Sequence, residues 1–148
     1  MSLRALAALA AGAVVLAGCG SKPSPSLIQL RSEGARICTA AGRSLARIPT
    51  PGTETGGAAF LKHGISVLTP ELVRLRVLVP PANVADVYRS ATDALADELD
   101  SLHSAVLALG RQHDPVLTFR ALQDRLGPLV TQADDAWQAL EVPACEQR

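Results

Sequence analysis

The chain has 148 residues, no formal net charge because 14 basic side chains balance 14 acidic ones, and 48% hydrophobic residues with few aromatics. This length suits one domain, and the apolar fraction excludes an intrinsically disordered chain. The balanced charge gives no basic excess for nucleic acid, so we expect no nucleic-acid partner.

The first residues have the layout of a secretion signal. Arg4 precedes an unbroken run of small and apolar residues at positions 5–16. A membrane-spanning helix needs about 20 such residues, and this run is shorter, so a signal peptide is favoured over a transmembrane segment.

The run ends in Leu16-Ala17-Gly18-Cys19, which resembles the lipobox of bacterial lipoproteins at all four motif positions. The resemblance implies that residues 1–18 are removed and that Cys19 carries acyl chains such as palmitate. It also implies a protein held at the cell membrane by this lipid anchor, on the side facing away from the cytoplasm. An ordinary signal peptide with a cysteine at its cleavage site is the alternative interpretation.

Residues 19–26 are predicted to be the lipidated cysteine and a flexible tether, because Pro and Ser dominate the segment. An extended form at about 3.1 Å per residue would lift the following domain roughly 20 Å from the bilayer. Residues 27–148 remain for the folded domain.

The folded part begins with two predicted helices. The first covers about residues 27–48, starts with a capping box formed by Ser26 and Gln29, and ends at the Pro-rich segment 49–52. The second covers about residues 57–79, and its heptad phase continues through Pro70, which favours one kinked helix. Residues 72–79 also alternate in part like a β-strand, which is the alternative.

Two further helices complete the domain. Asn83 begins a helical pattern that should stop at Gly110. Asp114 and Pro115 suit the cap and first position of a last helix reaching Leu140, with a kink or break near Pro128. Four amphipathic helices with short connections predict an all-α fold, an antiparallel up-down four-helix bundle with proline kinks.

Cys38 and Cys145 are the two cysteines left after Cys19, and they allow one intramolecular pairing. A disulfide between them is predicted for a protein outside the cytoplasm, and two separate buried thiols are the alternative. In an up-down bundle, Cys145 would lie at the end where the first helix begins. Cys38 is about three turns into that helix, so a bridge requires the tail to fold back or the first turns to overhang.

No residue pattern indicates catalysis. His63, His103 and His113 do not have the spacing of a metal site, and no nucleophile or phosphate-loop motif is present. We therefore expect a protein that is not an enzyme and that uses no metal and no cofactor.

The second helix has apolar residues on nearly every side. Beside its core stripe, Val73 and Val77 lie on the opposite side, and Phe60, Val67 and Leu78 lie on a flank. Such a helix is either the most buried of the bundle or presents these five residues to a partner.

The layout of the whole chain resembles small uncharacterised helical lipoproteins of high-GC bacteria. The features behind this are the leader, a cysteine in the first helix, a Pro-Pro break and a terminal cysteine, with 12 Arg against 2 Lys. The resemblance implies no activity. We expect a non-catalytic binding or structural module that contacts another envelope protein; the alternative is a carrier of a small, lipid-like apolar ligand between the helices.

Overall fold

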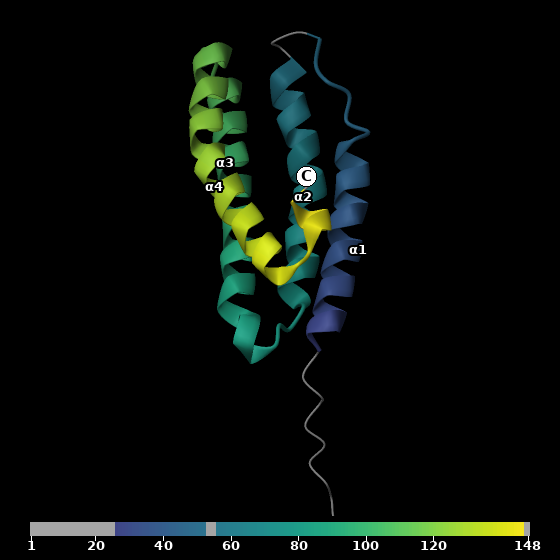
Figure 1. The fold of residues 1–148 in the computed structure, drawn as a ribbon. Helices are drawn as coiled ribbons and strands as arrows, with labels where there is room; N and C mark the ends of the chain where they lie inside the picture. Colours follow the sequence, from purple (N-terminus) through teal and green to yellow (C-terminus); the bar gives the residue numbers. More distant parts are fainter. Residues whose placement is uncertain (1–25, 53–55, 147–148) are drawn as a thin grey trace, which may run out of the picture.

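The computed structural model describes residues 26–52 and 56–146, and these residues form an antiparallel bundle of four α-helices (Figure 1). The helices are α1 (Leu27–Leu45), α2 (Gly57–Val77), α3 (Ala85–Gly110) and α4 (Pro115–Leu140). Two short 3-10 turns accompany them, η2 (Ala82–Val84) before α3 and η3 (Pro143–Cys145) after α4. The described ranges contain no strand, so the all-α prediction is confirmed and the strand alternative for residues 72–79 is wrong.

The predicted capping box starts α1. The Gln29 N–H donates to Ser26 Oγ at 3.2 Å, and the Ser26 N–H donates to Gln29 Oε1 at 2.9 Å. The helix ends at Leu45 rather than at Ile48, since the Ile48 N–H already bonds the Leu45 carbonyl in a tighter turn. Pro49 follows, and a proline disfavours helical backbone at the residue before it.

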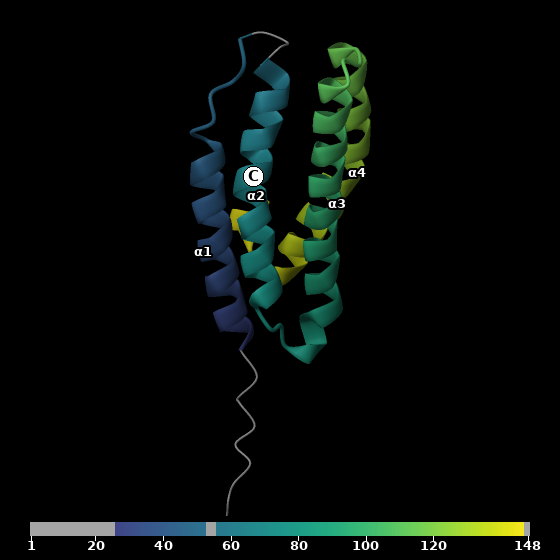
Figure 2. The ribbon, with the colours of Figure 1, turned by 180° about the vertical axis from the view of Figure 1, so that it is seen from behind.

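Both internal prolines lie inside continuous helices. α2 passes through Pro70 and α4 through Pro128, and both prolines are exposed, so water can reach the carbonyls that they leave without a donor. α4 runs beside α3 in its upper part and leans toward α2 in its lower part (Figures 1 and 2). Both helices therefore continue through their prolines without a break.

The boundaries of α3 differ slightly from the prediction. Asn83 lies in η2 and α3 begins at Ala85, so Asn83 does not cap the helix. Gly110 is the last helical residue, and the left-handed backbone that closes the turn belongs to Gln112, with φ 62°.

The core is divided into two clusters along the bundle axis. The main cluster fills the lower part and contains buried side chains from all four helices, among them Ile37 of α1 and the fully buried Leu75, Leu95 and Trp137. A smaller cluster of Leu61, Ala105 and Leu122 fills the upper part. Leu102 packs against both clusters and is itself only partly buried.

A polar contact fixes the centre of the main cluster. Tyr88 meets the Trp137 ring edge-on, with centroids 5.8 Å apart and an interplanar angle of 87°. The Tyr88 hydroxyl donates a 2.8 Å hydrogen bond to the Leu75 carbonyl near the end of α2. Burial raises the pKa of this phenol well above its ordinary value.

The chain folds back after α4 and joins it to α1. Glu141 adopts left-handed backbone with φ 57°, which reverses the chain into η3. η3 packs against α1, and Cys145 forms the predicted disulfide with Cys38, with Cα atoms 5.0 Å apart. The yellow segment that climbs from the end of α4 toward α1 is visible in Figure 1. Of the two geometries that a bridge allowed, the folded-back tail is therefore the one adopted.

Candidate functional site

The outer face of α2 is the surface that the sequence singled out. Val73 is 58% exposed and Val77 is 74% exposed, and they lie one helical turn apart. α2 packs against α1 on one side and α3 on the other, so neither neighbour covers this pair. Of the two interpretations of α2, exposure of these valines is the one that the structure bears out.

Of the other three predicted surface residues, two lie elsewhere on α2, and Leu78 directly follows the helix. Phe60 is exposed near the start of the helix. Val67 is half-buried and lines a cavity of about 230 Å³ between α1 and α2. Leu78 is half-buried against the main cluster. Val73 and Val77 therefore form the compact part of the predicted surface, and we call these two residues the outer α2 face.

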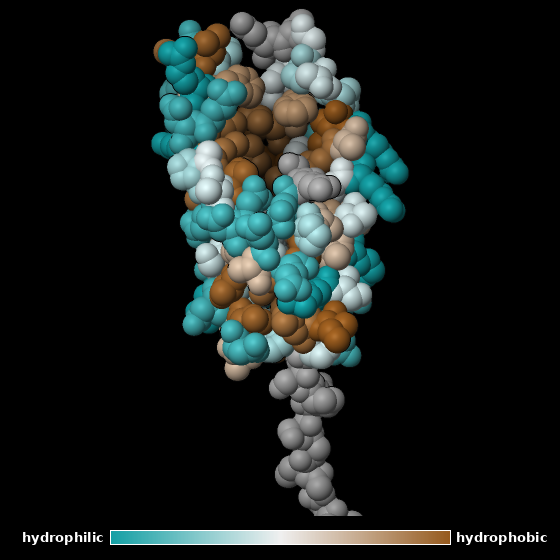
Figure 3. Space-filling model, viewed as in Figure 1, coloured by the Kyte–Doolittle hydropathy of each residue, from teal (hydrophilic) through white to brown (hydrophobic). Residues whose placement is uncertain are grey.

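A second apolar surface lies between α2 and α4. Figure 3 shows a hollow in the upper half of the molecule with apolar side chains along its walls. Partly buried residues are found at this level on three helices, namely Ile65 on α2, Leu102 on α3, and Phe119 and Leu126 on α4. We call this surface the upper hollow.

The length of α1 explains why the upper hollow is open. At about 1.5 Å per residue, the 19 residues of α1 span about 28 Å, whereas the 26 residues of α3 or α4 span about 39 Å. Each of these three helices begins or ends near the lower end of the bundle, so the shorter α1 does not reach the top (Figure 1). The seam between α2 and α4 therefore lacks a covering helix in its upper part.

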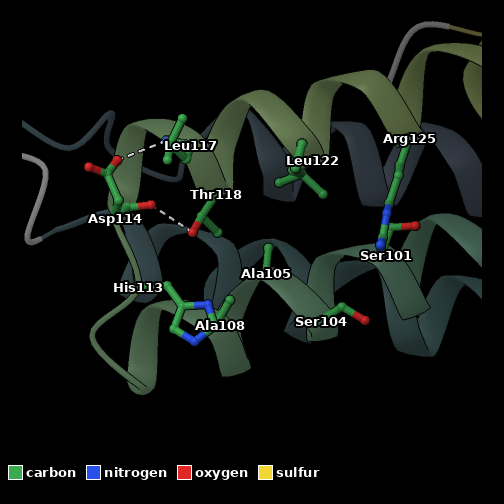
Figure 4. Close-up of a pocket in the computed structure, with 11 residues that line it drawn as sticks. Ser101, Ser104, Ala105, Ala108, His113, Asp114, Leu117, Thr118, Leu122 and Arg125 are labelled. Carbon is green, nitrogen blue, oxygen red and sulfur yellow. Dashed lines mark hydrogen bonds between the residues drawn. The ribbon is translucent and has the colours of Figure 1, made fainter.

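A third depression lies between α3 and α4, with a volume of about 500 Å³ (Figure 4). Its floor is apolar and includes Ala105, Ala108 and Leu122. Ser101, Ser104, His113, Thr118 and Arg125 supply polar groups around it.

The hydroxyls at this depression are engaged by the backbone. Ser101 donates to the Asp97 carbonyl at 2.9 Å, and Ser104 donates to the Asp100 carbonyl at 2.8 Å. Thr118 donates to the Asp114 carbonyl at 2.8 Å, as Figure 4 shows. These bonds direct the hydroxyls to carbonyls one helical turn earlier, and none of them pairs a nucleophile with a base.

Sequence reasoning did not identify the upper hollow or the α3–α4 depression. The depression had a signal, because Ser101, Ser104, Ala105 and Ala108 place small side chains along one flank of α3. The upper hollow had no local signal, since it depends on where α1 stops relative to the other helices.

Cys38 and Cys145 are buried and bridged, whereas Cys19 lies outside the described residues, as do the predicted leader and most of the tether. Within residues 26–52 and 56–146, no three His, Cys, Asp or Glu side chains come together in a way that could hold a metal ion. None of the helices in these ranges has the length and hydropathy needed to cross a membrane.

Comparison of the chain with protein-family models, with curated protein sequences and with solved structures finds no match.

Proposed function

We propose that this protein is a cell-envelope lipoprotein, anchored through Cys19, whose helical domain is a non-catalytic module that binds another envelope protein through the outer α2 face. The observation that supports it is the exposure of Val73 and Val77 on a helix whose two neighbours leave that face open. Two adjacent exposed valines offer apolar area that a partner could remove from water.

The anchor is tested by membrane fractionation. Wild-type protein should enter the detergent phase, and a Cys19→Ala variant should be released from the membrane, because acyl chains supply the membrane affinity. Equal partitioning of both proteins would contradict the anchor.

The partner surface is tested by photo-crosslinking in cells. A photoreactive residue at position 73 should crosslink to a defined protein, and Val77→Asp in the same chain should abolish that product. Val116 is 55% exposed, close to the 58% of Val73, but lies in the first turn of α4 at the other end of the bundle, so position 116 is the matched control. The same product from both positions, or none from position 73, would overturn the proposal.

A second candidate function is supported by the upper hollow. A lipid-like apolar ligand would cover side chains such as Leu102 and Leu126, which are partly exposed. A dansyl-labelled fatty acid should bind wild-type protein and lose affinity for a Leu126→Trp variant that fills the hollow, whereas Val130→Trp, on an exposed position of α4, should bind normally. Equal binding by all three proteins would exclude the hollow as the site.

A further inference from the structure

Apolar side chains are exposed at the end of the bundle where α1 begins and α2 leads into α3. Ile28 in the first turn of α1 is 76% exposed, and Val79 in the α2–α3 connection is 62% exposed. Ala82 is exposed at the same end, and Leu27 and Pro80 are half-buried. We call these five residues the lower rim, and Figure 3 shows apolar surface around that end.

The chain that leads to the proposed anchor leaves from this same end. Cys19 precedes Ser26 by seven residues (26 − 19 = 7), and seven fully extended residues span at most about 25 Å. The opposite end is farther away, since the 26 residues of α3 alone extend about 39 Å. The lower rim is therefore the exposed apolar surface that the anchor would hold closest to the bilayer.

Several arginines near the lower rim form ion pairs. Four arginines in the lower half of the bundle each lie within ion-pair distance of a carboxylate. The pairs are Arg31–Glu141 at 2.9 Å, Arg36–Glu33 at 2.7 Å, Arg76–Asp93 at 3.4 Å and Arg89–Asp86 at 2.9 Å. The same half of the bundle holds further carboxylates, including Asp97, Asp134 and Asp135, so this end combines exposed apolar groups with an acidic excess, which suits a zwitterionic lipid surface better than an anionic one.

We infer that the lower rim rests on the phospholipid surface into which the anchor inserts, with Ile28 and Val79 at the level of the headgroups. This inference rests on the proposed lipid anchor. Ile28 and Val79 come from two different elements, so their contact with lipid adds a second attachment to the anchor and sets the bundle upright on the membrane. The outer α2 face then begins beside the bilayer, because Val77 is the last residue of α2.

The inference is tested by depth-dependent quenching of tryptophan fluorescence. The lipidated protein is reconstituted in phosphatidylcholine vesicles that contain lipid brominated on its acyl chains. Ile28→Trp and Val79→Trp each add one indole at the rim, while the native Trp137 is buried and provides a constant background. Leu117→Trp is the matched control, since Leu117 is 62% exposed, as Val79 is, and lies near the start of α4 at the opposite end.

We expect the added fluorescence of the two rim variants to fall about twofold or more, and that of Leu117→Trp to stay unchanged, because side chains of surface-bound segments enter only the boundary region of the bilayer. The control also covers the intrinsic preference of tryptophan for the membrane interface. Equal quenching at positions 79 and 117, or no quenching at 28 and 79, would overturn the inference.

A failure of the anchor gives a different result, in which the wild-type protein does not float with the vesicles. In that case the same three variants are held on nickel-chelating lipid by a histidine tag that replaces residues 1–19, and the quenching pattern decides in the same way.

Discussion

Arg31 of α1 caps the C-terminal end of α4, because its Nε donates a 2.8 Å hydrogen bond to the Leu140 carbonyl oxygen. This carbonyl belongs to the last helical turn, where carbonyls lack donors from their own helix and a cation is favoured by the helix dipole. Arg31 also pairs with Glu141 at 2.9 Å, so one side chain from α1 holds the residue that reverses the chain.

We expect Arg31→Met to lower the free energy of unfolding by about 1–2 kcal/mol, since the hydrogen bond to the Leu140 carbonyl is lost while the apolar stem is kept. Glu141→Gln removes only the ion pair and should change stability by less than about 0.5 kcal/mol, because Glu141 is largely exposed. Urea denaturation of both variants measures the difference. Equal losses would show that the ion pair, and not the cap, is the important contact.

The Cys38–Cys145 disulfide closes a sequence separation of 107 residues. The chain-entropy model gives about 4–5 kcal/mol for a loop of this size, so a Cys38→Ala, Cys145→Ala variant should lose up to this amount. Because η3 packs against α1, hydrogen exchange should accelerate more in residues 27–45 than in α3. Uniform acceleration along the chain would contradict this picture.

Tyr88 should make the protein sensitive to alkaline pH. Its pKa is raised in the folded state by burial, so the folded protein keeps the phenol proton that the unfolded chain loses near pH 10. The stabilisation is therefore complete below about pH 10, and above it stability falls by about 1.4 kcal/mol per pH unit until the folded phenol ionises too.

A Tyr88→Phe variant should be about 1 kcal/mol less stable at pH 7, because the hydrogen bond to Leu75 is lost. Between about pH 10 and 11.5 it should lose less stability than wild type, since it has no phenol at this position. Thermal unfolding across this pH range compares the two, and parallel pH profiles would show that Tyr88 does not control the alkaline transition.

The turn between α3 and α4 offers a test of backbone conformation. Gly110 is helical, and a Cβ there would meet no atom within 4 Å, so Gly110→Ala should stabilise the protein by about 0.5–1 kcal/mol. Gln112 has φ 62°, and Gln112→Gly should be neutral or stabilising by a few tenths of a kcal/mol to about 1 kcal/mol, since the left-handed cost of a non-glycine residue exceeds the entropy cost of glycine. Destabilisation by Gly110→Ala would instead indicate left-handed backbone at Gly110.

The helices were predictable because their signals are local. The Ser26–Gln29 capping box and the Asp114–Pro115 start act within one helical turn, and both are present, with the Leu117 N–H donating to the Asp114 carboxylate at 2.9 Å. The disulfide followed from the number of cysteines. The left-handed residue at Gln112 was not predictable, because glycine is the favoured residue at such positions and Gly110 lies two residues away.

The candidate surfaces depended on tertiary packing. The apolar pattern of α2 allowed either burial or exposure of Val73 and Val77, and only the positions of α1 and α3 decide between them. The upper hollow arises in the same way from the early end of α1, which the sequence pattern had extended to Ile48. Local patterns thus predict the elements, whereas the open surfaces result from how far each element extends beside its neighbours.

The position of the disulfide determines how a pulling force would travel through the domain. A force applied between the N-terminal segment and the C-terminus would pass along residues 27–38, across the Cys38–Cys145 bond and out through Glu146. α2, α3 and α4 all lie within the covalently closed loop and would carry no load. With the proposed anchor at Cys19, the domain could therefore be stretched between its ends while the helices that form its candidate binding surfaces stay folded.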